Sequence, residues 1–473
     1  MKKIIYSIIF CVVLTFTSYT YGQTIDKNNL EVKIDALIPK QVNDSTPGLV
    51  VGIVQKGELI FSKGYGLANM SYGIPNSPKM VYNIGSVSKQ FLGYAFAMLH
   101  AKGDLNIDDS VNKYLKDFPK FKHNVTLRHL LTHTSGYREA YTMSVLAGRI
   151  IGVDHLSKEE CLEVVKRQPE LEFVPGSRWV YNSTAWVILA EVLEKVTAQP
   201  ADKWVENNIL RPLKMYDTQI ESYVGEVIKN SAESYTKHGD KEYSNKNSNR
   251  AIFGAADVYT SVYDLVKWIN NYRTAEIGGK AVNELFLAPF ILNDGTNSEY
   301  ALGIRNNSYR GLRRYEHSGS HEAFLTQLSY FPDYDLGIIT ISNFGNNGLI
   351  HSEEIAELFL KEYMTTQTNK ENQQEENNNK IKKWTPNQED LISFKGDYWS
   401  DEIETVYHVK IVDKNLTMQR RWLGEIRLEP IKQDLFKTNL GYNVNFIRNK
   451  KGVILGLYIQ SNRTSNIFFQ RKE

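Results

Sequence analysis

Ser86 and Lys89 lie three residues apart, the spacing that puts a nucleophile and its base on one face of a helix. The apolar stretch 91–99 follows and Gly103 is a natural stop, so the sequence predicts a buried helix that begins near Ser86. A serine hydroxyl needs a base to take its proton, and a lysine deprotonated by burial can be that base. The alternative is a serine N-cap beside a solvated lysine, and the pair alone favours this alternative.

A second candidate is the segment Tyr181-Asn182-Ser183, which precedes an apolar helix predicted over residues 185–196. Tyr181 can carry a proton beside the nucleophile where a neighbouring cation favours its phenolate. The alternative is a half-buried core tyrosine, with Ser183 as a helix cap.

A third candidate is His317-Ser318-Gly319-Ser320, just before a predicted strand pair. Gly319 permits close approach of the backbone to a ligand, and a donor or cation beside it could hold a substrate carboxylate. However, a histidine is not reliably cationic near neutral pH, and an ordinary strand-end histidine is the alternative. The stretch 133–136 also has a serine near a histidine, but it lacks the Gly-x-Ser-x-Gly elbow and is interpreted as a structural turn.

The composition of the chain narrows the function classes. Its 473 residues suggest two or three domains. Lys and Arg together number 56 and Asp and Glu 54, so no bulk positive field favours nucleic acid. No cluster of His, Cys or carboxylates has metal-ligand spacing, and we expect neither a metal nor another cofactor.

Residues 1–22 predict a secretory signal peptide, in which two lysines precede the apolar run 4–16 and Thr20 and Gly22 fit a cleavage site. The run is short for a membrane span, and an uncleaved N-terminal anchor is the alternative. We expect an exported protein, periplasmic or secreted, with no stable membrane span after cleavage. Cleavage leaves only Cys161, which excludes an internal disulfide and is interpreted as a buried small hydrophobe.

Three regions are predicted after the signal. Residues 25–364 mix strands and helices, with strand pairs near both ends that suggest one shared sheet. These pairs are 48–55 with 58–65 and 324–331 with 336–342. Residues 365–388 form a polar linker, and 389–473 read as successive strands of a small antiparallel sandwich or barrel.

Taken together and in this order, the three candidate segments resemble the motifs of the serine β-lactamase and penicillin-binding-protein superfamily. The resemblance is to the branch with class C β-lactamases, D-alanyl-D-alanine carboxypeptidases, D-aminopeptidases and esterases. The stretches 126–136, 254–268 and 300–303 also match sequence patterns typical of this branch, so the resemblance covers about residues 30–362. It implies an α+β fold with an antiparallel sheet flanked by helices, an all-helical part, and a small appended β domain.

The resemblance also implies roles for individual residues. Ser86 would form an acyl-enzyme, while Lys89 and Tyr181 would handle its proton and that of the leaving group. The backbone amides of Ser86 and Ser320 would form an oxyanion hole. The residues that would contact the substrate are Ser183, His317, Gly319 and Ser320.

Two departures from the motifs bear on the substrate. Ser183 stands where the branch usually has asparagine, and His317 stands in place of lysine, which makes a permanent hold on a β-lactam carboxylate less assured.

The prediction is an exported serine hydrolase of small amides or esters, with D-amino-acid peptides or carboxylic esters ahead of β-lactams. A cell-wall peptide is one candidate substrate. The alternatives are a catalytically weakened penicillin-binding or sensory protein, and a class C-like β-lactamase. Oligomeric state is left open.

Overall fold

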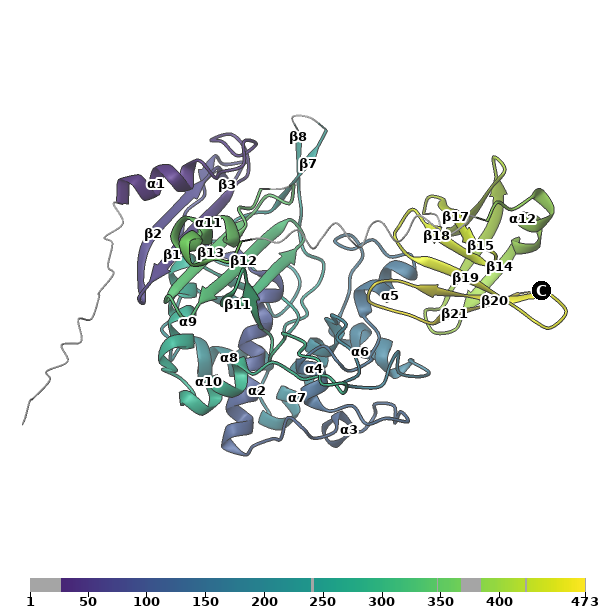
Figure 1. Ribbon diagram of the computed structural model, residues 1–473, viewed down its shortest axis with the longest axis horizontal. Coiled ribbons are helices and arrows are strands. Elements are labelled where there is room, and N and C mark those ends of the chain that lie inside the picture. The colour runs from purple at the N-terminus through teal and green to yellow at the C-terminus, as the bar shows by residue number, and fades with distance from the viewer. Residues whose placement is uncertain (1–26, 240–241, 347, 367–383, 422, 473) are drawn as a thin grey trace, which may run out of the picture.

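The computed structural model describes residues 27–239, 242–346, 348–366, 384–421 and 423–472 (Figure 1). The predicted signal peptide and most of the predicted linker lie outside these residues. Within them, no helix is both long enough and apolar enough to cross a membrane.

A six-stranded antiparallel sheet joins the two ends of the first region, in the order β10-β11-β12-β13-β1-β2. Its strands are β1 (Leu49–Gln55), β2 (Glu58–Tyr65), β10 (Arg305–Tyr309), β11 (Leu312–His321), β12 (Phe324–Phe331) and β13 (Leu336–Ser342). β1 pairs with β13, so the early hairpin completes a sheet begun by the late strands. This confirms the single sheet expected from the sequence.

Helices cover both faces of this sheet, which explains why β1 is apolar throughout. Val51 and Ile53 pack with α1 (Lys27–Asp35) and α11 (Ser352–Leu360) on one face. The alternate residues Val50 and Val54 join the main core on the other face, where α9 (Val262–Thr274) lies. A strand buried on both sides needs apolar residues at every position.

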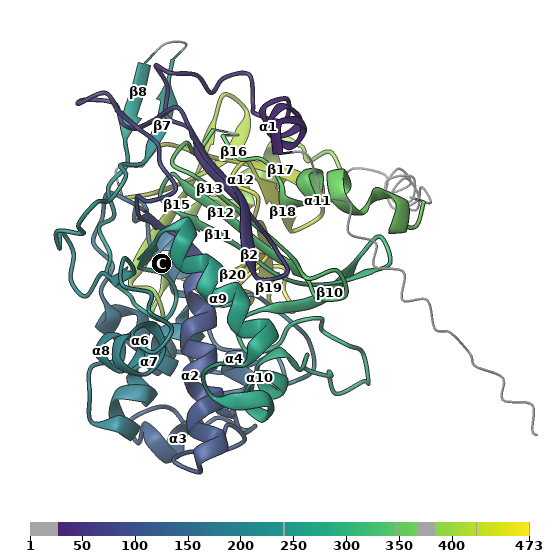
Figure 2. The ribbon, with the colours of Figure 1, turned by 90° about the vertical axis from the view of Figure 1, so that its left-hand side faces the viewer.

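The other helices form a layer beside the sheet, with α2 (Lys89–Lys102) at its centre (Figure 2). α2 packs against α7 (Thr184–Thr197) and α10 (Gly279–Leu287). The remaining members are α3 (Val111–Tyr114), α4 (Leu127–Leu131), α5 (Ala140–Leu146), α6 (Lys158–Lys166) and α8 (Ala201–Val205). Cys161, on α6, is buried as predicted.

Short strands outside the six-stranded sheet form three smaller sheets. β9 (Val258–Thr260) pairs with β5 (Tyr82–Asn83) and β6 (Gln219–Ile220). Two further pairs are β3 (Leu67–Asn69) with β4 (Ile74–Pro75) and β7 (Tyr235–His238) with β8 (Glu242–Asn245).

The C-terminal region is a closed barrel of antiparallel strands and not a sandwich. Its strands are β14 (Gly396–Ser400), β15 (Thr405–Val412), β16 (Asn415–Arg420), β17 (Ile426–Lys432), β18 (Leu435–Thr438), β19 (Asn443–Arg448), β20 (Ile454–Gln460) and β21 (Ile467–Arg471). A helix that the sequence analysis did not predict, α12 (Gln388–Phe394), precedes them. Trp384, inside the predicted linker, packs against Phe394 and Phe436 of this domain. An aromatic side chain at the end of a polar stretch therefore belongs with the barrel core.

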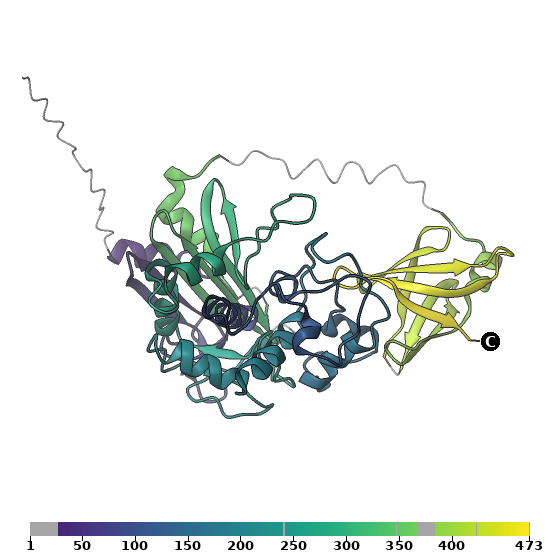
Figure 3. The ribbon, with the colours of Figure 1, turned by 90° about the horizontal axis from the view of Figure 1, so that it is seen from below.

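One end of the barrel rests on α5 of the first region (Figures 1 and 3). Met143 and Leu146 of α5 are buried in the apolar cluster of the barrel. The hydroxyl of Tyr407 donates to the carbonyl of Leu146 at 2.7 Å. Apolar burial and a hydrogen bond thus fix the position of the barrel on the first region.

Candidate active site

Ser86 and Lys89 meet where a 3-10 turn passes into the buried helix. The turn η1 spans Gly85–Ser88 and α2 begins at Lys89, slightly later than the sequence predicts. The Lys89 amine lies 3.0 Å from the Ser86 hydroxyl and 2.6 Å from the carbonyl oxygen of Ala255. The lysine is fully buried, so the solvated side chain of the alternative interpretation is excluded.

Burial also changes the charge of this lysine. Desolvation and, to a smaller extent, the nearby Arg463 guanidinium lower the pKa of Lys89 to about 7, against the opposing effects of Glu139 and Asp257. Within the described residues the amine forms no ion pair. Near neutral pH a large fraction of Lys89 is therefore uncharged and can accept the Ser86 proton.

Hydrogen bonds to β9 hold the turn in place. The amide of Val258 donates to the hydroxyl of Ser88 at 3.2 Å, and its carbonyl accepts from the amide of Ile84 at 3.0 Å. The side chain of Asn83 accepts from the amide of Gly85 at 2.9 Å. Ser88 and Asn83 therefore position the nucleophile without contacting it.

Two glycines let the strand β11 lie directly against this turn. A Cβ on Gly319 would lie 2.0 Å from the Ile84 carbonyl oxygen and 3.2 Å from the Ser86 nitrogen. A Cβ on Gly85 would lie 2.6 Å from the Ser320 nitrogen, and the φ of Gly85 is +52°. The backbone amides of Ser86 and Ser320 are thus brought to the same place, as a two-donor oxyanion site requires.

Tyr181 faces the same lysine from the start of α7. The Lys89 amine lies 5.1 Å from the centre of the Tyr181 ring. Behind the tyrosine, the buried ring of His133 packs at 4.2 Å between centroids and accepts from the amide of Asn182 at 2.9 Å. The stretch 133–136 is a turn, as predicted, but sequence reasoning missed that His133 supports Tyr181. The backbone of His133 has a positive φ of 57°, which only the fold reveals.

The phenol of Tyr181 is protonated, contrary to the phenolate considered from the sequence. Burial raises the pKa of Tyr181 to about 12, and the cations and hydroxyl around it reverse only part of that shift. The Ser86 hydroxyl lies close enough to lower this pKa, yet it forms no well-aligned hydrogen bond with the phenol. Tyr181 can therefore donate a proton, and Lys89 is the better base.

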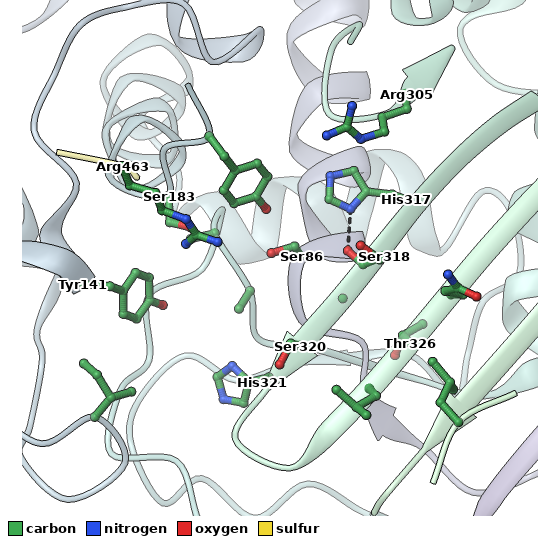
Figure 4. A pocket seen from close by; sticks show the side chains of 18 of the residues that line it. Ser86, Tyr141, Ser183, Arg305, His317, Ser318, Ser320, His321, Thr326 and Arg463 are labelled. Atoms are coloured by element: carbon green, nitrogen blue, oxygen red, sulfur yellow. Dashed lines mark hydrogen bonds between the residues drawn. The ribbon is translucent and has the colours of Figure 1, made fainter. Parts of the chain in front are cut away.

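His317 lies at the cavity but is neutral and already bonded within the protein. Its Nδ1 lies 2.6 Å from the carbonyl of Ser318, which only accepts, so Nδ1 carries the proton (Figure 4). Its Nε2 then accepts from the hydroxyl of Tyr300 at 2.8 Å. Burial and the nearby cations Lys89 and Arg305 lower the pKa of His317 to about 3. His317 is therefore not the cation that the sequence analysis considered for holding a substrate carboxylate.

Ser183 and Ser320 also line the cavity, but in different ways. Ser183 is buried at the start of α7, and its side chain does not cap that helix. Ser320 is exposed on β11. The structure therefore places the predicted site residues around one cavity.

This cavity has a volume of about 850 Å³. Three arginines line it, Arg250, Arg305 and Arg463, and Figure 4 shows Arg463 on the opposite side of Ser86 from His317. Sequence reasoning missed all three. Arg463 is the most unexpected because it comes from the barrel. Among the described residues, no group of three or more His, Cys, Asp or Glu side chains has metal-binding geometry.

The fold and the site define a class of protein. A family model described as Beta-lactamase matches residues 34–358, so the chain belongs to the beta-lactamase family. This is a family of serine hydrolases.

Two curated relatives are similar over part of their length. A putative penicillin-binding protein, PbpX, from Bacillus subtilis is 28% identical over 62% of this chain and 70% of its own. A putative D-alanyl-D-alanine carboxypeptidase from Escherichia coli O157:H7 is 29% identical over 39% of this chain and 46% of its own, less than half of that relative.

The fold of most of the chain is shared with a solved structure. The octameric penicillin-binding protein homologue from Pyrococcus abyssi matches with a TM-score of 0.62 at 22% identity. The match covers 95% of this chain and 100% of that one, so it includes the C-terminal barrel.

Proposed function

We propose that this protein is an exported serine hydrolase that cleaves small amides or esters through an acyl-enzyme on Ser86. The observation that carries the proposal is the 3.0 Å approach of the Ser86 hydroxyl to a fully buried lysine amine. A base whose pKa lies near the working pH is largely unprotonated and is still basic enough to take a proton from the serine hydroxyl. The predicted signal peptide supports action outside the cytoplasm.

The reaction would proceed in two halves. The Ser86 oxygen bonds to the substrate carbonyl carbon as its proton passes to Lys89, and the amides of Ser86 and Ser320 bind the oxyanion. The bond to the leaving nitrogen or oxygen then breaks, and that atom takes a proton through the phenol of Tyr181, which Lys89 replenishes. Water next attacks the ester, and the acid is released as Ser86 regains its proton.

We expect amides and esters to be cleaved in preference to β-lactams, because the third motif carries no permanent cation. His317 is uncharged and bonded on both ring nitrogens, so it offers no permanent cation to a β-lactam carboxylate. The E. coli relative is named as a carboxypeptidase, which supports D-peptides as the first class to test.

Intact-mass measurement after exposure to acyl donors tests the proposal. The panel is a fluorophosphonate, a penicillin, a cephalosporin, a D-alanyl peptide and a carboxylic ester. We expect one adduct on the wild type, none on Ser86→Ala, and an unchanged adduct on Ser318→Ala, which removes another exposed serine of the cavity. Folded wild-type protein that takes no label and hydrolyses nothing in the panel would contradict it.

The same panel separates the alternatives. A long-lived penicillin adduct without turnover of any donor would indicate a penicillin-binding or sensory protein, which the Ser183 departure favours. Fast cephalosporin hydrolysis would indicate a β-lactamase.

A further inference from the structure

The cavity contains three arginines, and two of them are already paired with carboxylates. Arg250 lies 2.6 Å from Glu322, and Arg305 lies 3.6 Å from Glu316. Arg463 forms no ion pair with any described residue. The residue is exposed, and its guanidinium carbon lies 5.0 Å from the centre of the Tyr181 ring. Arg463 is thus the one arginine of the cavity that has no ion pair with a carboxylate of the described residues.

The loop that carries Arg463 has a defined structure. It joins β20 to β21, and Ser461 and Thr464 close it with reciprocal hydrogen bonds, the amide of Ser461 donating to the Thr464 carbonyl at 2.7 Å. The Thr464 side chain is buried. The short turn therefore projects the Arg463 side chain outward from a fixed base.

The first region also grips this loop directly. Arg138 donates to the carbonyl of Ser465, and the amide of Ser465 donates to the carboxylate of Glu172 at 3.3 Å. Arg138 and Glu172 are both almost completely buried. Groups buried in one domain therefore hold the backbone two residues from Arg463, which sets where its guanidinium enters the cavity.

We propose that Arg463 binds a free carboxylate on the leaving group of the substrate, so that the barrel completes the specificity site. Tyr181 is placed to protonate the leaving atom of the substrate. Because the Arg463 guanidinium lies against the Tyr181 ring, it is also near the rest of the leaving group. A guanidinium matches a carboxylate with two parallel hydrogen bonds. The substrate class is therefore peptides or esters whose leaving residue ends in a free carboxylate. This inference rests on acyl-enzyme formation at Ser86.

A pair of thioesters tests it. Both carry N-acetyl-D-alanine as the acyl group, and their leaving groups are mercaptoacetate, with a carboxylate, and mercaptoacetamide, without one. Thiol release gives kcat/KM for each at about pH 8.5, where Lys89, with its pKa of about 7, is uncharged. The ratio of the two values cancels any effect of Arg463 on Lys89 itself.

We expect the wild type to prefer the carboxylate, mainly through KM. Arg463→Ala should lose about 10- to 100-fold on mercaptoacetate and less than about 2-fold on mercaptoacetamide, as expected for a lost charged hydrogen-bonded pair. Arg463→Lys should retain part of the preference, because it keeps the positive charge but cannot form the two parallel hydrogen bonds of a guanidinium. Asn462→Ala, exposed in the same loop, should leave the ratio unchanged.

An unchanged ratio in Arg463→Ala, or an equal fall on both thioesters, would overturn this inference while leaving the acyl-enzyme intact. No release of either thiol above the Ser86→Ala background, from folded wild-type protein, would instead refute the acyl-enzyme, and this inference with it.

Discussion

Arg138 and Glu402 form a buried ion pair across the boundary between the two domains, with the Arg138 Nε 2.6 Å from Glu402 Oε1. The arginine is 1% exposed and the glutamate 9%. The same guanidinium contacts Glu172, 3.0 Å away, and the carbonyl of Ser465. One side chain therefore links the catalytic region to two separate loops of the barrel.

Arg138→Ala should weaken the docking of the barrel. The change leaves two buried carboxylates without their cation, and breaking such a pair typically costs about 3–5 kcal/mol. Glu172, whose pKa burial raises to about 7, can take up a proton and reduce that cost. We expect a lower Tm by calorimetry and slower hydrolysis of the mercaptoacetate thioester, although Ser86 and Lys89 are untouched.

Arg167→Ala is the matched control for this prediction. Arg167 also pairs across the boundary, 2.6 Å from Glu404, but both side chains are about half exposed. Exposed pairs contribute about 0–1 kcal/mol, so Tm and activity should barely change. Equal effects of the two substitutions would contradict the special role of the buried pair.

The pH dependence of acylation should follow Lys89. Only the uncharged amine accepts a proton, so kcat/KM should rise with pH and level off above the Lys89 pKa of about 7. Arg463 lowers this pKa, whereas Glu139 and Asp257 raise it. Arg463→Ala should therefore move the inflection to higher pH, and Arg463→Lys should move it less. Stopped-flow thiol release with the uncharged mercaptoacetamide thioester measures it, and an unmoved inflection in Arg463→Ala would contradict the assignment.

Gly319→Ala should separate the strand β11 from the catalytic turn. The added methyl would meet the Ile84 carbonyl at 2.0 Å, which forces the two oxyanion donors apart. Loss of one oxyanion donor typically costs about 10²–10³-fold in kcat. Gly424→Ala is the control, because a Cβ there meets nothing within 4 Å. Near wild-type turnover by folded Gly319→Ala would argue against the oxyanion site.

Tyr181→Phe should affect poor leaving groups most. The substitution keeps the ring between Lys89 and Arg463 but removes the proton donor. An amine must be protonated as it leaves and a thiolate need not be, so amide hydrolysis should fall by about 10²–10⁴-fold and thioester hydrolysis much less. Parallel assays on a D-alanyl peptide and a thioester measure the difference. Equal losses on both would assign Tyr181 a purely structural role.

Local sequence patterns predicted the sheet, the helix after Ser86 and the candidate pair Ser86 and Lys89. The sheet and the helix were predictable because hydrophobic patterning is local, and a spacing of three residues puts Ser86 and Lys89 on one face, although that pair alone favoured a solvated lysine. The helix α12 was missed, although Asn387 and Asp390 form a capping box at its start and were visible in the sequence.

Other parts of the site could not be predicted in this way. The neutral state of His317 depends on burial and on a hydroxyl, that of Tyr300, which approaches through the tertiary fold. The position of Arg463 depends on how one domain docks on another, and no spacing along the chain encodes that. Only folding brings these groups together.

The division of the cavity wall between two domains has an evolutionary consequence. The turn with Ser86 and the helix that begins at Lys89 are enclosed in a core where almost any change is costly. The turn with Arg463 is a surface loop at the end of a barrel with its own separate core. Selection can therefore change the mouth of the cavity at Arg463 while the core around Ser86 and Lys89 stays constant, so the first domain can acquire a new substrate preference through changes in the barrel.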